Sequence, residues 1–64
     1  MKKEKNCMTI TEVISNGQCI FVNHVTRFKT EKTFTYQGVE YLVTYVNNNP
    51  TQMINRSTGH ITYA

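Results

Sequence analysis

The middle of the chain reads Thr33-Phe34-Thr35-Tyr36-Gln37-Gly38-Val39-Glu40-Tyr41-Leu42-Val43-Thr44-Tyr45-Val46. Apolar and polar residues alternate on both sides of Gln37-Gly38, which is the pattern of a β-hairpin with a two-residue turn. Such a turn needs positive φ at both central residues, which glycine adopts freely and glutamine less readily than asparagine. We therefore predict an antiparallel hairpin with the pairs Tyr36–Val39, Thr35–Glu40, Phe34–Tyr41 and Thr33–Leu42.

The two faces of this hairpin differ in character, because side chains alternate between the faces of a strand. One face carries Phe34, Tyr36, Val39, Tyr41, Val43 and Tyr45, and the other carries Thr33, Thr35, Glu40, Leu42, Thr44 and Val46. An isolated hairpin is marginally stable in water, so the rest of the chain is expected to cover the aromatic face. A platform for stacking unpaired bases is the alternative role of these rings. We favour the core.

Two further hairpins are predicted on either side. Residues 8–14 alternate like a strand, Asn16-Gly17 indicates a turn of two residues or of three with a glycine bulge, and residues 18–29 form a long strand. The run Ile20-Phe21-Val22 lacks alternation, as in a strand that is covered on both sides or bent at a barrel corner. After a break at residues 47–50, residues 52–56 and 60–64 form the third hairpin around Gly59. No window predicts a helix.

Three hairpins in series predict an all-β fold. We expect one domain over residues 7–64, an antiparallel meander of five to six strands that forms an SH3-like or OB-like barrel or a curled sheet. Closure would protect the edge strands from pairing with other chains. Residues 1–6 are expected to be a flexible basic tail.

Size and charge restrict the function. A chain of 64 residues buries too little surface to build a deep, water-excluding cleft easily, so we do not expect an enzyme. The formal net charge is +3, but three lysines and one glutamate of the tail supply most of it, and the body holds four cations against three acids. A nucleic-acid surface should show its charge on the folded body.

The cysteines and histidines give no pattern of metal ligation. Cys7, Cys19, His24 and His60 lack the close spacing of zinc ligands, and Cys19 and His24 are predicted to lie on opposite faces of one strand. We expect no metal, no cofactor and two reduced thiols in a cytoplasmic protein. No stretch approaches the roughly 20 apolar residues of a membrane span.

The candidate contact residues lie in the basic segment 27–32, in which Arg27 and Lys29 would share a strand face, and on the polar flank of the central hairpin. They are Arg27, Lys29, Lys32, Thr33, Thr35, Glu40, Thr44 and Arg56. We expect a non-catalytic adaptor or inhibitor that binds another protein through a sheet face, an edge or a hairpin tip. The alternative is a small basic barrel that binds single-stranded DNA or RNA through Arg, Lys and aromatic residues. Homo-oligomers through the sheet edges are a further expectation.

Overall fold

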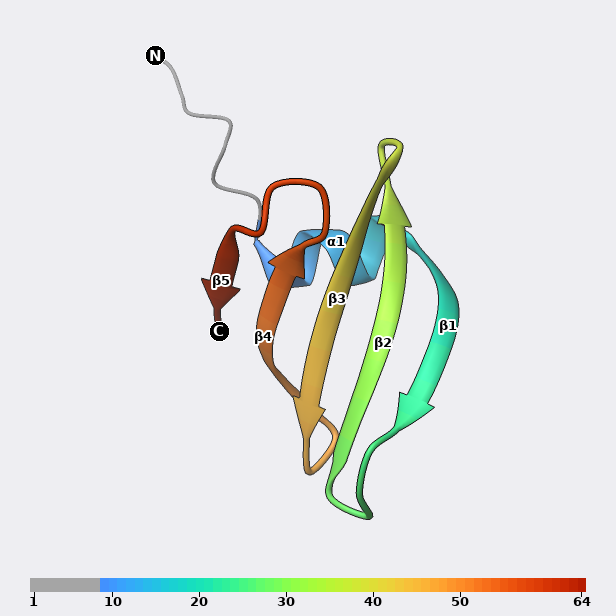
Figure 1. Cartoon of the computed structure of the whole chain (residues 1–64), viewed down its shortest axis with the longest axis vertical. Helices are drawn as coiled ribbons and strands as arrows, with labels where there is room; N and C mark the ends of the chain where they lie inside the picture. Colours follow the sequence, from blue (N-terminus) through green and yellow to red (C-terminus); the bar gives the residue numbers. More distant parts are fainter. Residues whose placement is uncertain (1–8) are drawn as a thin grey trace.

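The computed structural model describes residues 9–64 as one helix followed by five strands. The elements are α1 (Ile10–Asn16), β1 (Gln18–His24), β2 (Lys29–Tyr36), β3 (Val39–Val46), β4 (Asn49–Asn55) and β5 (Ile61–Tyr63). The strands form one antiparallel sheet in the order β1-β2-β3-β4-β5 (Figure 1). The predicted tail and Cys7 lie outside the described residues.

This sheet confirms the meander but not the barrel. Each strand pairs with its neighbours along the chain, while β1 and β5 lie at the two ends of the order and do not pair with each other. The SH3-like or OB-like barrel is therefore wrong, and the sheet has two edges. The all-β class is also corrected, because a short helix precedes the first strand.

The central hairpin forms as predicted. β2 and β3 pair in the expected register, with Tyr36 opposite Val39 and Phe34 opposite Tyr41. Gln37 and Gly38 have φ of 53° and 79°, the positive values that a tight two-residue turn requires. Alternation and the Gln37-Gly38 turn together specify this register, because a slip by one residue would move every ring to the other face.

The predicted first strand is wrong. Residues 10–16 form α1, a helix of seven residues. Thr9 caps its first turn, because the backbone N–H of Glu12 donates a hydrogen bond to Thr9 Oγ1 at 3.1 Å. Ile10 and Val13 are buried and Ile14 is half-buried, which is the spacing of one helical face.

Gly17 ends this helix instead of forming a hairpin turn. Its backbone N–H donates a hydrogen bond to Val13 O at 2.8 Å, and its φ is −84°. A Cβ at this position would lie 2.6 Å from Val13 O and 2.8 Å from Thr35 O. The glycine is thus required by the close approach of two backbone segments and not by positive φ.

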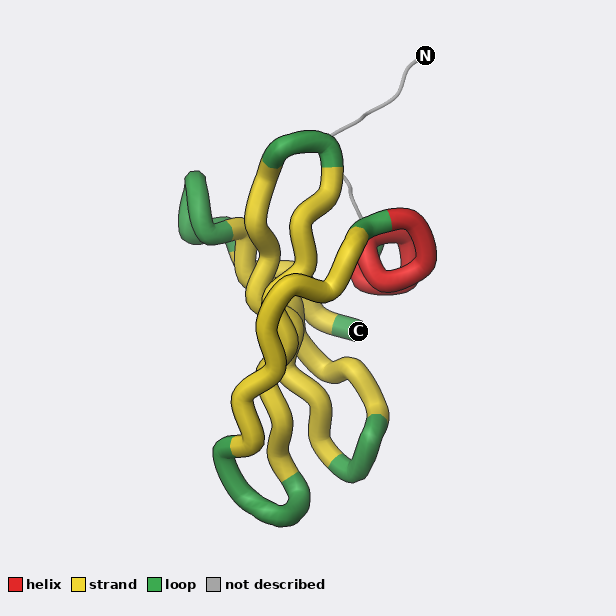
Figure 2. The backbone as a smooth tube through the Cα atoms, turned by 90° about the vertical axis from the view of Figure 1, so that its right-hand side faces the viewer, coloured by secondary structure: helices red, strands yellow, loops and turns green. Residues whose placement is uncertain are grey.

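The core lies between α1 and one face of the sheet, which we call the helix face. The buried apolar residues are Ile10, Val13, Phe34, Tyr41, Val43 and Met53, and Ile14, Tyr36, Val39 and Tyr45 pack against them. The core role of Phe34 and Tyr41 is confirmed. Figures 1 and 2 show that α1 crosses the strands on one side only, near the end of the sheet with the β2–β3 turn. On the opposite side, the open face, no helix of residues 9–64 lies over the sheet.

Two bulges interrupt the pairing. The register shifts between Cys19 and Phe21 on β1, and between Thr44 and Tyr45 where β3 meets β4. β1 ends at His24, so the predicted strand over residues 18–29 is too long. The third hairpin is confirmed in β4 and β5, with Gly59 at a φ of 82°, although β4 begins earlier than predicted, at Asn49.

Candidate functional site

A row of mostly apolar side chains crosses the whole open face. Successive strand pairs place one residue of each strand opposite the next, in the order Phe21, Thr33, Leu42, Ile54 and Ile61. We call these five residues the open-face row. Phe21 and Ile61 are exposed at its two ends, and Leu42 and Ile54 are half-buried. Thr33 is 8% exposed, because it lies between the side chains of β1 and β3.

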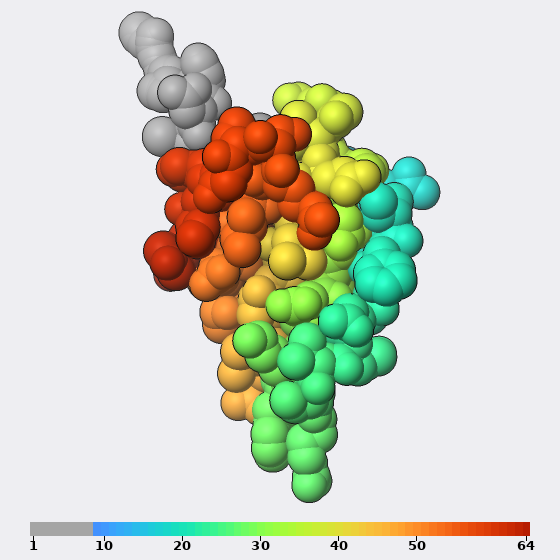
Figure 3. Space-filling model, viewed as in Figure 1, coloured from blue at the N-terminus to red at the C-terminus, as the bar shows by residue number. Residues whose placement is uncertain are grey.

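Polar residues border the row on both sides. Thr35 pairs with Glu40 on the side toward the β2–β3 turn, and Glu31 pairs with Thr44 on the other side. Arg56 Nε lies 3.9 Å from Glu40 Oε1, and both side chains are more than half exposed. An apolar centre with a polar border is the usual composition of a protein interface. Figure 3 shows this face of the molecule.

The predicted contact residues do not all lie on this face. Thr33, Thr35, Glu40 and Thr44 belong to the open face by their register, and Lys29 lies on it at the start of β2. Lys32 pairs with Val43 and therefore lies on the helix face. The polar flank of the hairpin is thus brought together, whereas the cations are separated.

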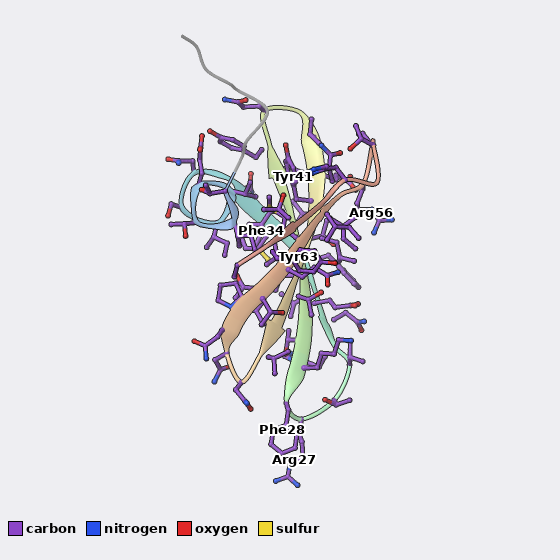
Figure 4. All side chains as sticks on the ribbon, turned by 90° about the vertical axis from the view of Figure 1, so that its left-hand side faces the viewer. Arg27, Phe28, Phe34, Tyr41, Arg56 and Tyr63 are labelled. Carbon is purple, nitrogen blue, oxygen red and sulfur yellow. The ribbon has the colours of Figure 1, made fainter. Side chains whose placement is uncertain are left out.

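The separation of the cations is visible along the length of the sheet. Arg27 lies in the β1–β2 loop, not on a strand face with Lys29, and its guanidinium carbon is 5.3 Å from the centre of the Phe28 ring. Arg56 lies in the turn between β4 and β5 at the opposite end of the molecule (Figure 4). A continuous basic track for a phosphate backbone is therefore not formed by these four cations.

A small hollow on the helix face gathers polar groups. Its volume is about 190 Å³, and it is lined by His24, Thr30, Lys32, Tyr45 and Asn48. The ammonium of Lys32 lies 4.7 Å from the centre of the Tyr45 ring, a cation–π distance. Burial raises the pKa of the Tyr45 phenol, and the negative charge of a Cys19 thiolate adds to the effect. A second hollow, of about 350 Å³, lies between the start of α1 and the β4–β5 pair.

One polar contact connects α1 with the sheet. The hydroxyl of Tyr36 donates a hydrogen bond to Glu12 Oε2 at 2.9 Å. This bond raises the pKa of the phenol, because it stabilises the protonated form, and the carboxylate charge acts in the same direction. The contact orients the helix on the hairpin.

The bulge in β1 corrects the prediction for Cys19 and His24. Cys19 is opposite Phe34 and His24 is opposite Thr30, so both lie on the helix face. Their partners are four residues apart on β2, about 13 Å at the rise of a strand, which is too far for a Cys–His pair. Within residues 9–64, no three His, Cys, Asp or Glu side chains are grouped as metal ligands. No helix in the same range is long and apolar enough to cross a membrane.

Sequence reasoning missed the exposed apolar residues of β1. The run Ile20-Phe21-Val22 was expected in a strand covered on both sides or bent at a barrel corner, but the sheet does not close into a barrel and all three residues are exposed, Phe21 at 61%. Ile54 and Ile61, which complete the open-face row, were not singled out either. Alternation across the β4–β5 pair could have placed Ile54 and Ile61 on the face of Leu42, had the start of β4 been known.

The chain matches no protein-family model, and comparisons with curated proteins and with solved structures give no significant match. The function proposed for the chain therefore rests on the arrangement of the residues described above.

Proposed function

We propose that the protein is a non-catalytic protein-binding module whose open face receives the apolar side of an amphipathic helix of another protein. The observation that carries this proposal is the open-face row, a mostly apolar row that spans all five strands on the side that α1 leaves uncovered. Isolated exposed apolar residues are common on protein surfaces, but a continuous row with a polar border is typical of an interaction site.

The dimensions of the row suit a helix. Four spacings between neighbouring strands, of about 4.8 Å each, give a row of about 19 Å. A helix rises about 1.5 Å per residue, so about 13 residues would cover the row. α1 lies across β2, β3 and β4 on the helix face, and a partner helix on the open face would complete a three-layer arrangement around the sheet.

The charges around the row support a protein partner over a nucleic acid. Glu40 and Arg56 are close enough to compensate each other, and Glu31 lies on the same face as Lys29. This border has no excess of positive charge to attract phosphates. Binding to a protein through the row should change little with salt, whereas binding to DNA or RNA should weaken steeply as counterions rebind.

Affinity capture from a nuclease-treated native lysate identifies the partner. The purified partner is then titrated with the unmodified chain and with variants of it. We expect Phe21→Ser and Ile61→Ser, at the two ends of the row, each to weaken binding about tenfold. Phe28→Ser is the matched control, because Phe28 is as exposed as Phe21 (60% against 61%) but lies in the β1–β2 loop. Equal losses in all three variants would refute the open-face site. Failure to retain any protein after nuclease treatment, or a steep salt dependence, would favour the nucleic-acid alternative.

A further inference from the structure

We infer that β1 is a self-association edge, on which a second copy of this chain adds its own β1 in antiparallel orientation. This inference concerns a different surface from the open-face row and does not depend on it. β1 is the last strand on its side of the sheet, so no described segment pairs with its outer edge. None of its residues, Gln18–His24, is an acid, a lysine or an arginine. Natural edge strands are usually protected by such charges.

The hydrogen-bond pattern of the sheet identifies the free backbone groups. Tyr36 and Val39 flank a two-residue turn and so form a hydrogen-bonded pair. From Tyr36 backward along β2, the backbone N–H and C=O groups of successive residues point alternately toward β3 and toward β1. Two loop bonds agree with this phase: Val25 N–H donates to Lys29 O at 3.0 Å, and Asn47 N–H donates to Phe28 O at 2.8 Å.

In this alternation, the backbone groups of Thr33 and Glu31 point toward β1. Phe21 and Asn23 lie opposite them, so the N–H and C=O groups of these two residues point toward β2. The N–H and C=O groups of Val22 and His24 then point outward, away from the sheet. An added strand is the protein segment whose own backbone groups match such alternating donors and acceptors. The free groups therefore indicate a strand as the occupant, and not a helix or a loop.

The sequence of β1 allows this strand to be a second copy. The bulge between Cys19 and Phe21 interrupts the edge, but residues 21–24 beyond it pair regularly with β2, and Val25 follows with a backbone hydrogen bond to Lys29 O. A two-fold axis at Asn23 places Phe21, which lies on the open face, opposite the partner's Val25, the residue that follows β1. Both are exposed apolar residues. The same axis pairs Val22 with the partner's His24, which joins the outward groups in four hydrogen bonds between the chains. No like charges meet, and the pairing avoids the bulge.

Asn23 gives a sharp test, because this register places it opposite its own copy. Within one chain, Asn23 Nδ2 donates to Glu31 Oε1 at 3.5 Å, so Asn23→Lys should keep the fold by pairing with this carboxylate. Between chains, two lysines would face each other about 5 Å apart and raise the dimer dissociation constant at least about fourfold. Gln18→Lys is the matched control, since Gln18 lies on the same face beyond the bulge.

The measurement is the molar mass of the 64-residue chain by light scattering and sedimentation, over about 10 µM to 1 mM. We expect a dimer whose dissociation constant rises at least about fourfold in Asn23→Lys and stays unchanged in Gln18→Lys. In a background with Cys7→Ser and Cys19→Ser, Asn23→Cys should form a disulfide-linked dimer on mild oxidation. The expected Cα separation of about 4.5 Å is within the range for a disulfide, and Gln18→Cys should not crosslink. A monomer throughout the concentration range, or a dimer that neither Asn23 variant affects, would overturn the inference.

Discussion

Replacing Val13 by alanine tests the position of α1. This is the part of the fold for which the sequence pattern predicted a strand. Val13 is fully buried between the helix and the sheet, in a cluster with Phe34, Tyr41, Val43 and Met53. A helix of seven residues is too short to be stable in water by itself, so packing must hold it. The substitution removes two methyl groups from this contact and leaves the backbone of the helix intact.

The magnitude follows from the burial. Two buried carbons contribute about 1.6 kcal/mol at roughly 0.8 kcal/mol each, and the cavity that remains adds about 1 kcal/mol. We therefore expect Val13→Ala to lower the free energy of unfolding by about 2–3 kcal/mol. A domain of this size has roughly 3–5 kcal/mol from its core, so the variant should be close to unfolding at room temperature.

Urea denaturation followed by circular dichroism measures this loss. With a slope of about 1 kcal/mol per molar urea, the midpoint should fall by about 2 M or more. Thr11→Ala is the matched control, because it also replaces a β-branched residue of α1 but at an exposed position, where alanine should be neutral or slightly stabilising. If Val13→Ala shifts the midpoint no more than Thr11→Ala does, α1 is not packed on the sheet and the core described above is incorrect.

Two further predictions concern the junction of α1 with the sheet. Gly17→Ala should destabilise the protein by about 1–3 kcal/mol in the same urea assay, because its Cβ would approach two backbone oxygens to within 2.8 Å, and Ser15→Ala, at an exposed neighbouring position, should not. The pKa of Tyr36 is raised above 10.0 in the folded protein by its bond to Glu12, so this contact stabilises the fold below pH 10 and is lost as the pH rises through the raised pKa. Tyr36→Phe should therefore flatten the decline of stability above about pH 10, measured by urea denaturation at a series of pH values, and an unchanged decline would show that the bond is not formed.

The central hairpin could be predicted because its signals are local and agree with one another. Alternation specifies the faces, the Gln37-Gly38 pair specifies the turn, and the two together specify the register. The same reasoning identified the core role of Phe34 and Tyr41 and the polar flank with Thr35 and Glu40. It could not locate the open-face row, because the row depends on how β1, β4 and β5 align with the hairpin over long sequence distances.

A strand was wrongly predicted for residues 8–14, because the local signals of this segment conflict. β-branched residues and the Asn16-Gly17 pair favour a strand and a turn. The spacing of Ile10, Val13 and Ile14 and the Thr9-x-x-Glu12 capping pattern favour a helix, and the short length hid this periodicity. Tertiary packing decided between them, since the helix buries Val13 against the aromatic face.

This choice also explains why the sheet has a free edge. The predicted hairpin would have paired residues 8–14 with β1, protected its outer backbone groups and supplied a sixth strand toward closure of a barrel. Residues 10–16 form α1 instead and satisfy their hydrogen bonds within the helix, so they cannot pair with β1. The helix thus covers the aromatic face. β1, which contains no acid, lysine or arginine, stays exposed, and no described segment pairs with its outer edge. One local decision in the sequence, helix over strand, both completes the core and creates the edge at which a second chain can add.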